Sequence, residues 1–263
     1  MVDPRNKDPI KTLLRLAPWT EQVKEITYLS GGYSNDNYYV STNEKNYALR
    51  IRKRPRPSKN EQQYLKISNA PEVAAYDSMT GDMLTRWIDG ELIADKPFTI
   101  KEAACYLRQL HSEIPSNISH YNVIERILTA VNSANYVKEL IKKIGWKPQT
   151  IGPSHNDLNP WNIIRVENGF RTLDWEYAGN NDPIFDLVAL CHGLEFSQHE
   201  TKEVADAFVS NITNDHIIRT RGIFLLREHA WAVDQIQSGN ARDEIVEQRD
   251  TCLEYLQHLV QEL

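Results

Sequence analysis

The residues best suited to chemistry lie near the middle of the 263-residue chain. Asn162 follows Asp157 by five residues, and Asp174 follows Asn162 by twelve. A carboxylate can orient an acceptor hydroxyl and take its proton, and this role fits Asp157. Asn162 and Asp174 offer the oxygen ligands that Mg²⁺ prefers. The set predicts phosphoryl transfer, because that reaction depends on positioning and charge neutralisation more than on covalent help.

The residues around this set give the pattern its meaning, since an Asp and an Asn at such spacing are common in ordinary loops. His155 precedes the set, and we interpret it as a scaffold residue that holds the loop by hydrogen bonds. Apolar runs at 162–166 and 170–173 flank Asn168-Gly169, a hairpin signal. The hairpin would place Asn162 and Asp174 on its two sides.

The elements that must position these groups change in type along the chain. Five short β-branched or aromatic runs predict an antiparallel sheet, at 26–29, 37–40, 47–51, 73–76 and 83–87. Helical patterns cover 60–68, 99–111, 122–144 and three segments within 200–263. The predicted class is α+β, with a small antiparallel-sheet lobe at 1–88 and a mainly helical lobe at 89–263.

The strand-rich lobe carries residues suited to phosphate binding. Gly31 and Gly32 separate the first two runs, and their backbone N–H groups, with Asn35 nearby, could cradle an anion. A simple hairpin turn is the alternative for this glycine pair. Arg50 lies on the third run, and its guanidinium could grip phosphate oxygens bidentately.

Six cations fall between residues 50 and 59. We interpret most of them as a solvated loop, since only Arg50 lies in a convincing strand. A nucleic-acid patch is the alternative, but the net charge of −6 argues against a general nucleic-acid binder. The three cysteines form no Cys-x-x-Cys pair, and no run approaches the ~20 apolar residues of a membrane span. We therefore expect a cytoplasmic protein without a membrane or nucleic-acid partner.

Residues 154–162, followed by 173–176, resemble the catalytic core of the aminoglycoside phosphotransferase and choline kinase superfamily, which is related to protein kinases. The family motif is His-x-Asp-x-x-x-x-Asn, followed by Ile/Leu-Asp-Trp/Phe-Glu. Residues 176–187 resemble the choline kinase and thiamine kinase branches, and residues 29–35 resemble the family's phosphate-covering hairpin. Arg50 lies where protein kinases have a lysine and choline kinases commonly have an arginine. The resemblance implies that Glu61, at the start of the following helix, orients Arg50. The resemblance implies a bilobal protein-kinase-like fold and an ATP- and Mg²⁺-dependent kinase. It also implies that Asp186 is structural and bonds the catalytic-loop backbone.

The acceptor is predicted from three further residues. The helix carrying Trp231 resembles the choline kinase helix with Trp-x-x-Trp, but the second aromatic is replaced by Asp234. Glu176 could face the acceptor or be ion-paired, and Trp231 could belong to the core. An aromatic face with carboxylates recognises cations. We expect a small cationic alcohol, choline or ethanolamine first and thiamine second. A nucleotide-binding pseudokinase is a further alternative, which Asp157, Asn162 and Asp174 together disfavour.

Overall fold

The computed structural model describes residues 8–16, 22–30, 32–54, 61–115 and 119–263. They divide into two compact units, one made of 1–96 with 161–176 and the other of 97–160 with 177–263. The sequence predicts a boundary after residue 88 and leaves the hairpin in the helical lobe. The structure differs because the hairpin belongs to the first unit, where β6 (Glu91–Leu92) pairs with β8 (Ile163–Val166).

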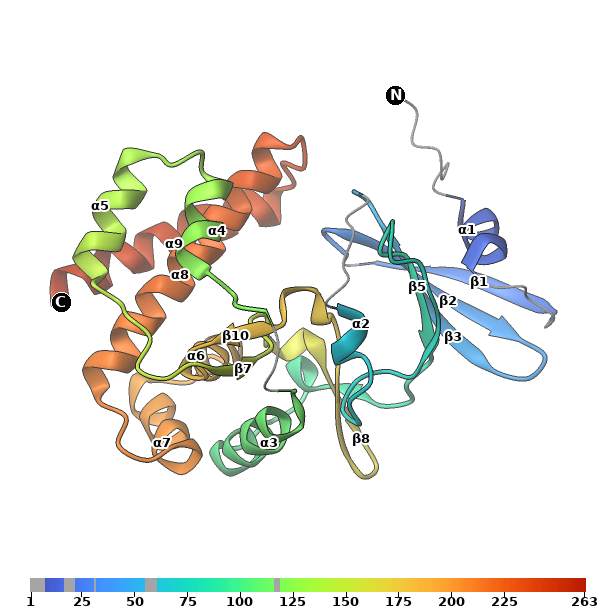
Figure 1. The fold of residues 1–263 in the computed structure, drawn as a ribbon, viewed down its shortest axis with the longest axis horizontal. Coiled ribbons are helices and arrows are strands. Elements are labelled where there is room, and N and C mark those ends of the chain that lie inside the picture. The colour runs from blue at the N-terminus through green and yellow to red at the C-terminus, as the bar shows by residue number, and fades with distance from the viewer. Residues whose placement is uncertain (1–7, 17–21, 31, 55–60, 116–118) are drawn as a thin grey trace. The chain divides into compact units, whose positions relative to one another are not determined.

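The first unit contains the predicted five-stranded antiparallel sheet, in the order β1-β2-β3-β5-β4 (Figure 1). Its strands are β1 (Val23–Leu29), β2 (Asn35–Thr42), β3 (Asn46–Arg52), β4 (Val73–Tyr76) and β5 (Met83–Arg86). Alternation places Val40, Leu49 and Leu84 in a core that solvent does not reach. Helix α1 (Pro9–Leu16), which the sequence analysis did not predict, adds Leu13 to this core.

Two elements of the first unit lie next to the predicted site residues. Helix α2 (Glu61–Tyr64) is shorter than the predicted 60–68, because tight turns follow it, with the N–H of Ile67 bonded to the carbonyl of Tyr64. The predicted hairpin is present as β8 and β9 (Gly169–Thr172), and it forms a three-stranded sheet with β6. Gly169 takes φ 111°, which glycine adopts without steric cost.

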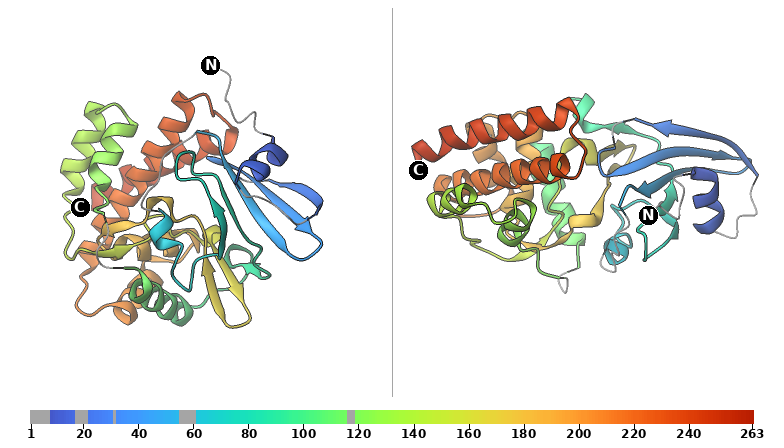
Figure 2. Two further views of the ribbon diagram at one scale, coloured as in Figure 1. Left: turned by 45° about the vertical axis from the view of Figure 1, so that its right-hand side comes forward. Right: turned by 90° about the horizontal axis from the view of Figure 1, so that it is seen from above.

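The second unit is mainly helical, as predicted. Its helices are α3 (Ile100–Glu113), α4 (Val123–Ala130), α5 (Asn135–Ile144), α6 (Ile184–Gly193), α7 (Gln198–Phe208), α8 (Asn214–Gln237) and α9 (Asp243–Glu262). The three predicted C-terminal helices are confirmed, and α8 and α9 lie side by side (Figure 2). The prediction of a single helix over 122–144 was wrong, because Asn132 and Ser133 take φ of 50° and 55° and separate α4 from α5.

Strands β7 (Gly152–Ser154) and β10 (Gly179–Asn181) pair beside the buried helix α6 of the second unit. The predicted capping box of α3 is present, with the side chains of Thr99 and Glu102 bonded to each other's backbone N–H groups. Among the described residues, no helix is long and apolar enough to cross a membrane.

Candidate active site

Asp186 fixes the backbone of the loop that carries Asp157. It lies in the first turn of α6, it is fully buried, and its two oxygens accept the N–H groups of His155 and Asn156, each at 2.7 Å. Nε2 of His111 lies 3.0 Å from Asp186 Oδ2. Burial opposes ionisation of Asp186, but these partners outweigh it and hold its pKa below the usual value. The hydrogen bonds are those expected of a structural aspartate.

His155 and Asn156 hold the same loop from inside the second unit. His155 is fully buried, and its Nδ1 accepts the N–H of Asp157 at 3.3 Å, in keeping with a scaffold role. Asn156 takes φ 64°, and its amide group donates to the carbonyl of Gly179 at 3.0 Å and accepts from Asn181 at 2.8 Å. Sequence reasoning missed Asn156, whose strained backbone is fixed by these bonds.

The Asp157 side chain is 20% exposed and has one oxygen held by an arginine from α8. Nη1 of Arg227 donates to Asp157 Oδ1 at 3.0 Å, and Nη2 donates to the carbonyl of Asn156 at 2.9 Å. Sequence reasoning missed Arg227. The available signal was a charged pair, Arg227-Glu228, directly after the apolar run 223–226 of a predicted helix.

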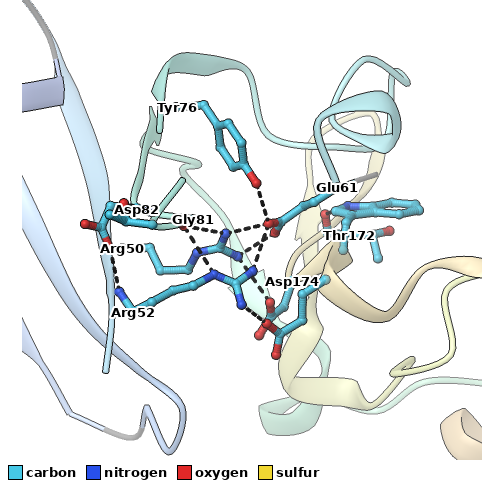
Figure 3. A network of polar contacts seen from close by, with 11 residues as sticks. Arg50, Arg52, Glu61, Tyr76, Gly81, Asp82, Thr172 and Asp174 are labelled. Carbon is cyan, nitrogen blue, oxygen red and sulfur yellow. Dashed lines mark hydrogen bonds and ion pairs between the residues drawn. The ribbon is translucent and has the colours of Figure 1, made fainter. Parts of the chain in front are cut away.

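In the first unit, Arg50 and Glu61 form the predicted pair (Figure 3). The two Nη atoms of Arg50 donate to the two oxygens of Glu61 at 2.7 and 2.8 Å. Arg50 Nη1 also lies 3.3 Å from Asp174 Oδ1. Burial disfavours the charged guanidinium, but Glu61 outweighs it, so the pKa of Arg50 is raised. Glu61 thus orients an ionised arginine beside Asp174.

Arg52 corrects the interpretation of the basic run as a solvated loop. It is the last residue of β3, it is 3% exposed, and it lies on the same face as Arg50 because strand side chains alternate. Its Nη2 donates to Glu61 at 2.9 Å, and its Nη1 pairs with Glu176 (Figure 3). Of the other cations, Arg56 and Lys59 lie outside the described residues.

The loop between β1 and β2 is held by Lys53, whose Nζ donates to the carbonyls of Gly32 and Tyr33 at 2.8 and 3.1 Å. A Cβ atom at Gly32 would lie 2.2 Å from the carbonyl oxygen of Asn35, so only glycine fits there. Gly31 lies outside the described residues. Phosphate binding by Gly31, Gly32 and Asn35 stays a prediction.

The predicted metal ligands lie at the two ends of the β8–β9 hairpin. The N–H of Leu173 donates to the carbonyl of Asn162 at 2.7 Å, which brings the ends together. Asp174 follows with φ 57° and a side chain that is 30% exposed. Trp175 anchors this turn, because it is fully buried, bonds the carbonyl of Thr172 at 2.7 Å and stacks on Tyr64.

One amide oxygen and one carboxylate fit Mg²⁺, which takes its remaining oxygens from phosphates and water in nucleotide sites. Within the described ranges, no group of three or more His, Cys, Asp or Glu side chains could hold a metal ion. The residues therefore suit a cation shared with a nucleotide, and the metal-binding role of Asn162 and Asp174 stays a prediction.

The three predicted acceptor residues lie in different units. Glu176 belongs to the first unit and is ion-paired with Arg52, which supports the ion-paired alternative for this residue. Trp231 and Asp234 are half-buried and lie one turn apart on α8 of the second unit. A joint acceptor site of these three residues stays a prediction.

Comparison with known proteins gives consistent matches. Residues 127–219 match the phosphotransferase enzyme family. The protein LicA of Haemophilus influenzae is 22% identical over 213 residues, which cover 70% of this chain and 61% of LicA. The thiamine kinase of Escherichia coli O157:H7 is 22% identical over 200 residues, which cover 71% of this chain and 73% of the relative. The chain thus matches less than two thirds of that LicA sequence.

Solved structures show the same fold. The choline kinase LicA from Streptococcus pneumoniae superposes with a TM-score of 0.74 at 20% identity, covering 95% of this chain and 96% of that structure. A spectinomycin phosphotransferase in complex with ADP and spectinomycin has a TM-score of 0.59 at 12% identity, covering 95% of each chain.

These matches confirm the predicted resemblance to the aminoglycoside phosphotransferase and choline kinase superfamily. They also confirm the α+β, protein-kinase-like fold, and they support the predicted class of enzyme, a small-molecule kinase. Two solved neighbours were determined with a nucleotide, LicA with AMP and the spectinomycin phosphotransferase with ADP.

Proposed function

We propose that the protein uses ATP and Mg²⁺ to phosphorylate the hydroxyl group of a small cationic alcohol, choline or ethanolamine first. The observation that carries this proposal is that each unit holds its own phosphotransfer groups in fixed positions. Asp157 stands on a loop held by Asp186, and Arg50 is oriented by Glu61 beside Asp174. A chain without catalytic use of these groups would not need to hold them so firmly.

Each group has a defined part in the proposed reaction. The Arg50 guanidinium binds the α- and β-phosphates, with Glu61 keeping its plane fixed. One oxygen of Asp157 accepts the proton of the acceptor hydroxyl, while that hydroxyl oxygen bonds to the γ-phosphorus and the bond from the γ-phosphorus to the ADP oxygen breaks. Mg²⁺, when bound by Asn162 and Asp174, neutralises charge on the phosphates.

Two lines of support favour a cationic acceptor. Trp231 and Asp234 offer an aromatic face and a carboxylate one turn apart on α8, a combination suited to a weakly hydrated cation. The relatives by sequence include LicA and thiamine kinases, and one thiamine kinase, from Salmonella heidelberg, is 33% identical over 97 residues. Thiamine is therefore the second candidate acceptor.

The test is formation of a phosphate ester by the purified protein with Mg²⁺ and ATP. Choline, ethanolamine, thiamine, methylthioribose and an aminoglycoside are compared by ³¹P NMR and ADP release. We expect the highest kcat/KM for choline or ethanolamine, and a poor rate for the choline isostere with carbon in place of the charged nitrogen. A neutral sugar as best acceptor would contradict the cation proposal. Nucleotide binding without turnover would favour the pseudokinase.

A cytoplasmic location is part of the proposal, because ATP is the donor. The cysteines are free thiols, as expected in a reducing compartment. Burial raises the pKa of Cys191 and Cys252 to about 12, so these two thiols are poorly reactive. We propose no nucleic-acid partner, in keeping with the acidic net charge.

A further inference from the structure

Arg227 is a buried cation in the middle of α8, and only 8% of its surface is exposed. Its guanidinium carbon lies 5.7 Å from the ring centres of both Phe185, on α6, and Phe224, one turn earlier on α8. The two rings lie 5.8 Å apart and edge to face. Aromatic rings beside a guanidinium favour its charge and restrict its orientation.

The polar edge of Arg227 meets the proposed catalytic loop at two points. Nη1 donates to Asp157 Oδ1 at 3.0 Å and Nη2 to the carbonyl of Asn156 at 2.9 Å. One rigid group therefore holds both the side chain of Asp157 and the backbone just before it.

The positive charge of Arg227 neutralises two carboxylates, those of Asp157 and Glu228. Nη1 also lies 2.9 Å from Glu228 Oε1. Burial disfavours the charge on Arg227, but Glu228, Tyr121 and Asp157 outweigh it and raise its pKa. Burial raises the pKa of Glu228 despite Arg227. Without Arg227, the carboxylates of Asp157 and Glu228 would repel each other in a poorly solvated place.

We infer that Arg227 is a positioning residue that sets the orientation of the Asp157 carboxylate for phosphoryl transfer. The inference rests on the proposed function, because it gives Arg227 a role only through Asp157. A purely structural ion pair would instead affect folding stability and leave turnover by the folded protein unchanged.

A double-mutant cycle with Arg227→Met and Asp157→Asn separates these roles. In the wild-type background, Arg227→Met should lower kcat roughly 10- to 100-fold with KM for ATP nearly unchanged, because positioning acts on the reacting step. In the Asp157→Asn background, the same change should lower the residual kcat less than about twofold, because the carboxylate it positions is gone. Arg227→Lys should restore part of kcat, since lysine supplies charge without the fork.

Arg219→Met is the matched control, because Arg219 lies on the same helix, pairs with Asp215 at 2.8 Å and bonds the carbonyl of Ile144 at 2.6 Å. It should leave kcat unchanged. Equal loss of kcat from Arg227→Met in both backgrounds would overturn the inference, as would a lowered melting temperature with normal kcat. If Arg227→Met does not fold, Arg227→Lys takes its place in the cycle with the same criterion. Wild-type protein without turnover would overturn the proposed function and this inference with it.

Discussion

Arg50 contacts two carboxylates with different proposed roles, Glu61 as its orienting partner and Asp174 as a metal ligand. Its Nη1 lies 2.7 Å from Glu61 Oε1 and 3.3 Å from Asp174 Oδ1 (Figure 3). Glu61 is 1% exposed, and its carboxylate accepts hydrogen bonds from Arg50, Arg52 and the hydroxyl of Tyr76. Burial opposes ionisation of Glu61, but the arginines outweigh it and lower its pKa. Glu61 is therefore the fixed partner of Arg50, and the contact of Arg50 Nη1 with Asp174 is the longer one.

Replacement of Arg50 tests this arrangement. Arg50→Ala should raise KM for ATP roughly tenfold or more, equivalent to ~1.4 kcal/mol of binding, and should raise KM for the acceptor much less. Arg50→Lys should lose only part of this affinity, because lysine keeps the charge without the planar fork. Steady-state kinetics with each substrate varied in turn is the measurement. A larger effect on the acceptor KM would place Arg50 outside the nucleotide site.

The partners of the chemical groups were harder to predict than the groups themselves. Asp157, Asn162 and Asp174 stand in a motif, so their types and order carry the prediction. Arg227 approaches Asp157 from 70 residues away, and no local pattern predicts such a contact. Arg52 could have been predicted, because it follows Arg50 by two residues and so lies on the same face of the strand. The surrounding run of cations instead favoured a solvated loop.

Elements with a strong period were predicted well. The five strands were predicted from short apolar, β-branched or aromatic runs, and α3 begins with a capping box, so these patterns are local. The break between α4 and α5 was not predicted, because it contains neither Gly nor Pro. Asn132 and Ser133 supply its left-handed backbone. Helix α1 is only eight residues long, and it is defined by packing of Leu13 against the sheet.

The loop between β1 and β2 offers a test at the level of one element. Gly32→Ala would force a Cβ atom to within 2.2 Å of the Asn35 carbonyl oxygen, so the loop must shift. We expect KM for ATP to rise at least threefold, while KM for the acceptor stays near normal, since the predicted role of this loop is to cover phosphates. Asn43→Ala, at an exposed position in the turn between β2 and β3, is the control. An unchanged KM for ATP in Gly32→Ala would contradict that role.

At the scale of the whole molecule, a half-buried histidine makes stability depend on pH. His192 ends α6 beside the ring of Phe224, at 5.3 Å between centres. Burial, with a smaller effect of Arg221, lowers the pKa of His192 to about 4. The unfolded chain binds a proton near pH 6.5, while the folded protein resists it. Folding stability is therefore unaffected by His192 above pH ~7 and falls as the pH drops from about 6.5 toward 4.

His192→Gln should reduce the loss of folding stability at acid pH. The difference in unfolding free energy between variant and wild type should grow by roughly 1 kcal/mol per pH unit below pH ~6.5, somewhat less than the ~1.4 limit because the ring is partly exposed. Urea unfolding at a series of pH values measures it. His199→Gln, at an exposed position on α7, should change nothing. Parallel curves for wild type and His192→Gln would contradict the prediction.

The most direct test of the account is phosphate-ester formation by Asp157→Asn, measured beside Mg·ATP affinity by calorimetry. The account predicts that kcat falls at least ~10²-fold, the low end for a positioned general base, because the amide cannot accept the hydroxyl proton. Mg·ATP affinity should stay near the wild-type value, because the groups proposed to hold the nucleotide lie elsewhere in the chain. Near-normal turnover by Asp157→Asn would contradict the account.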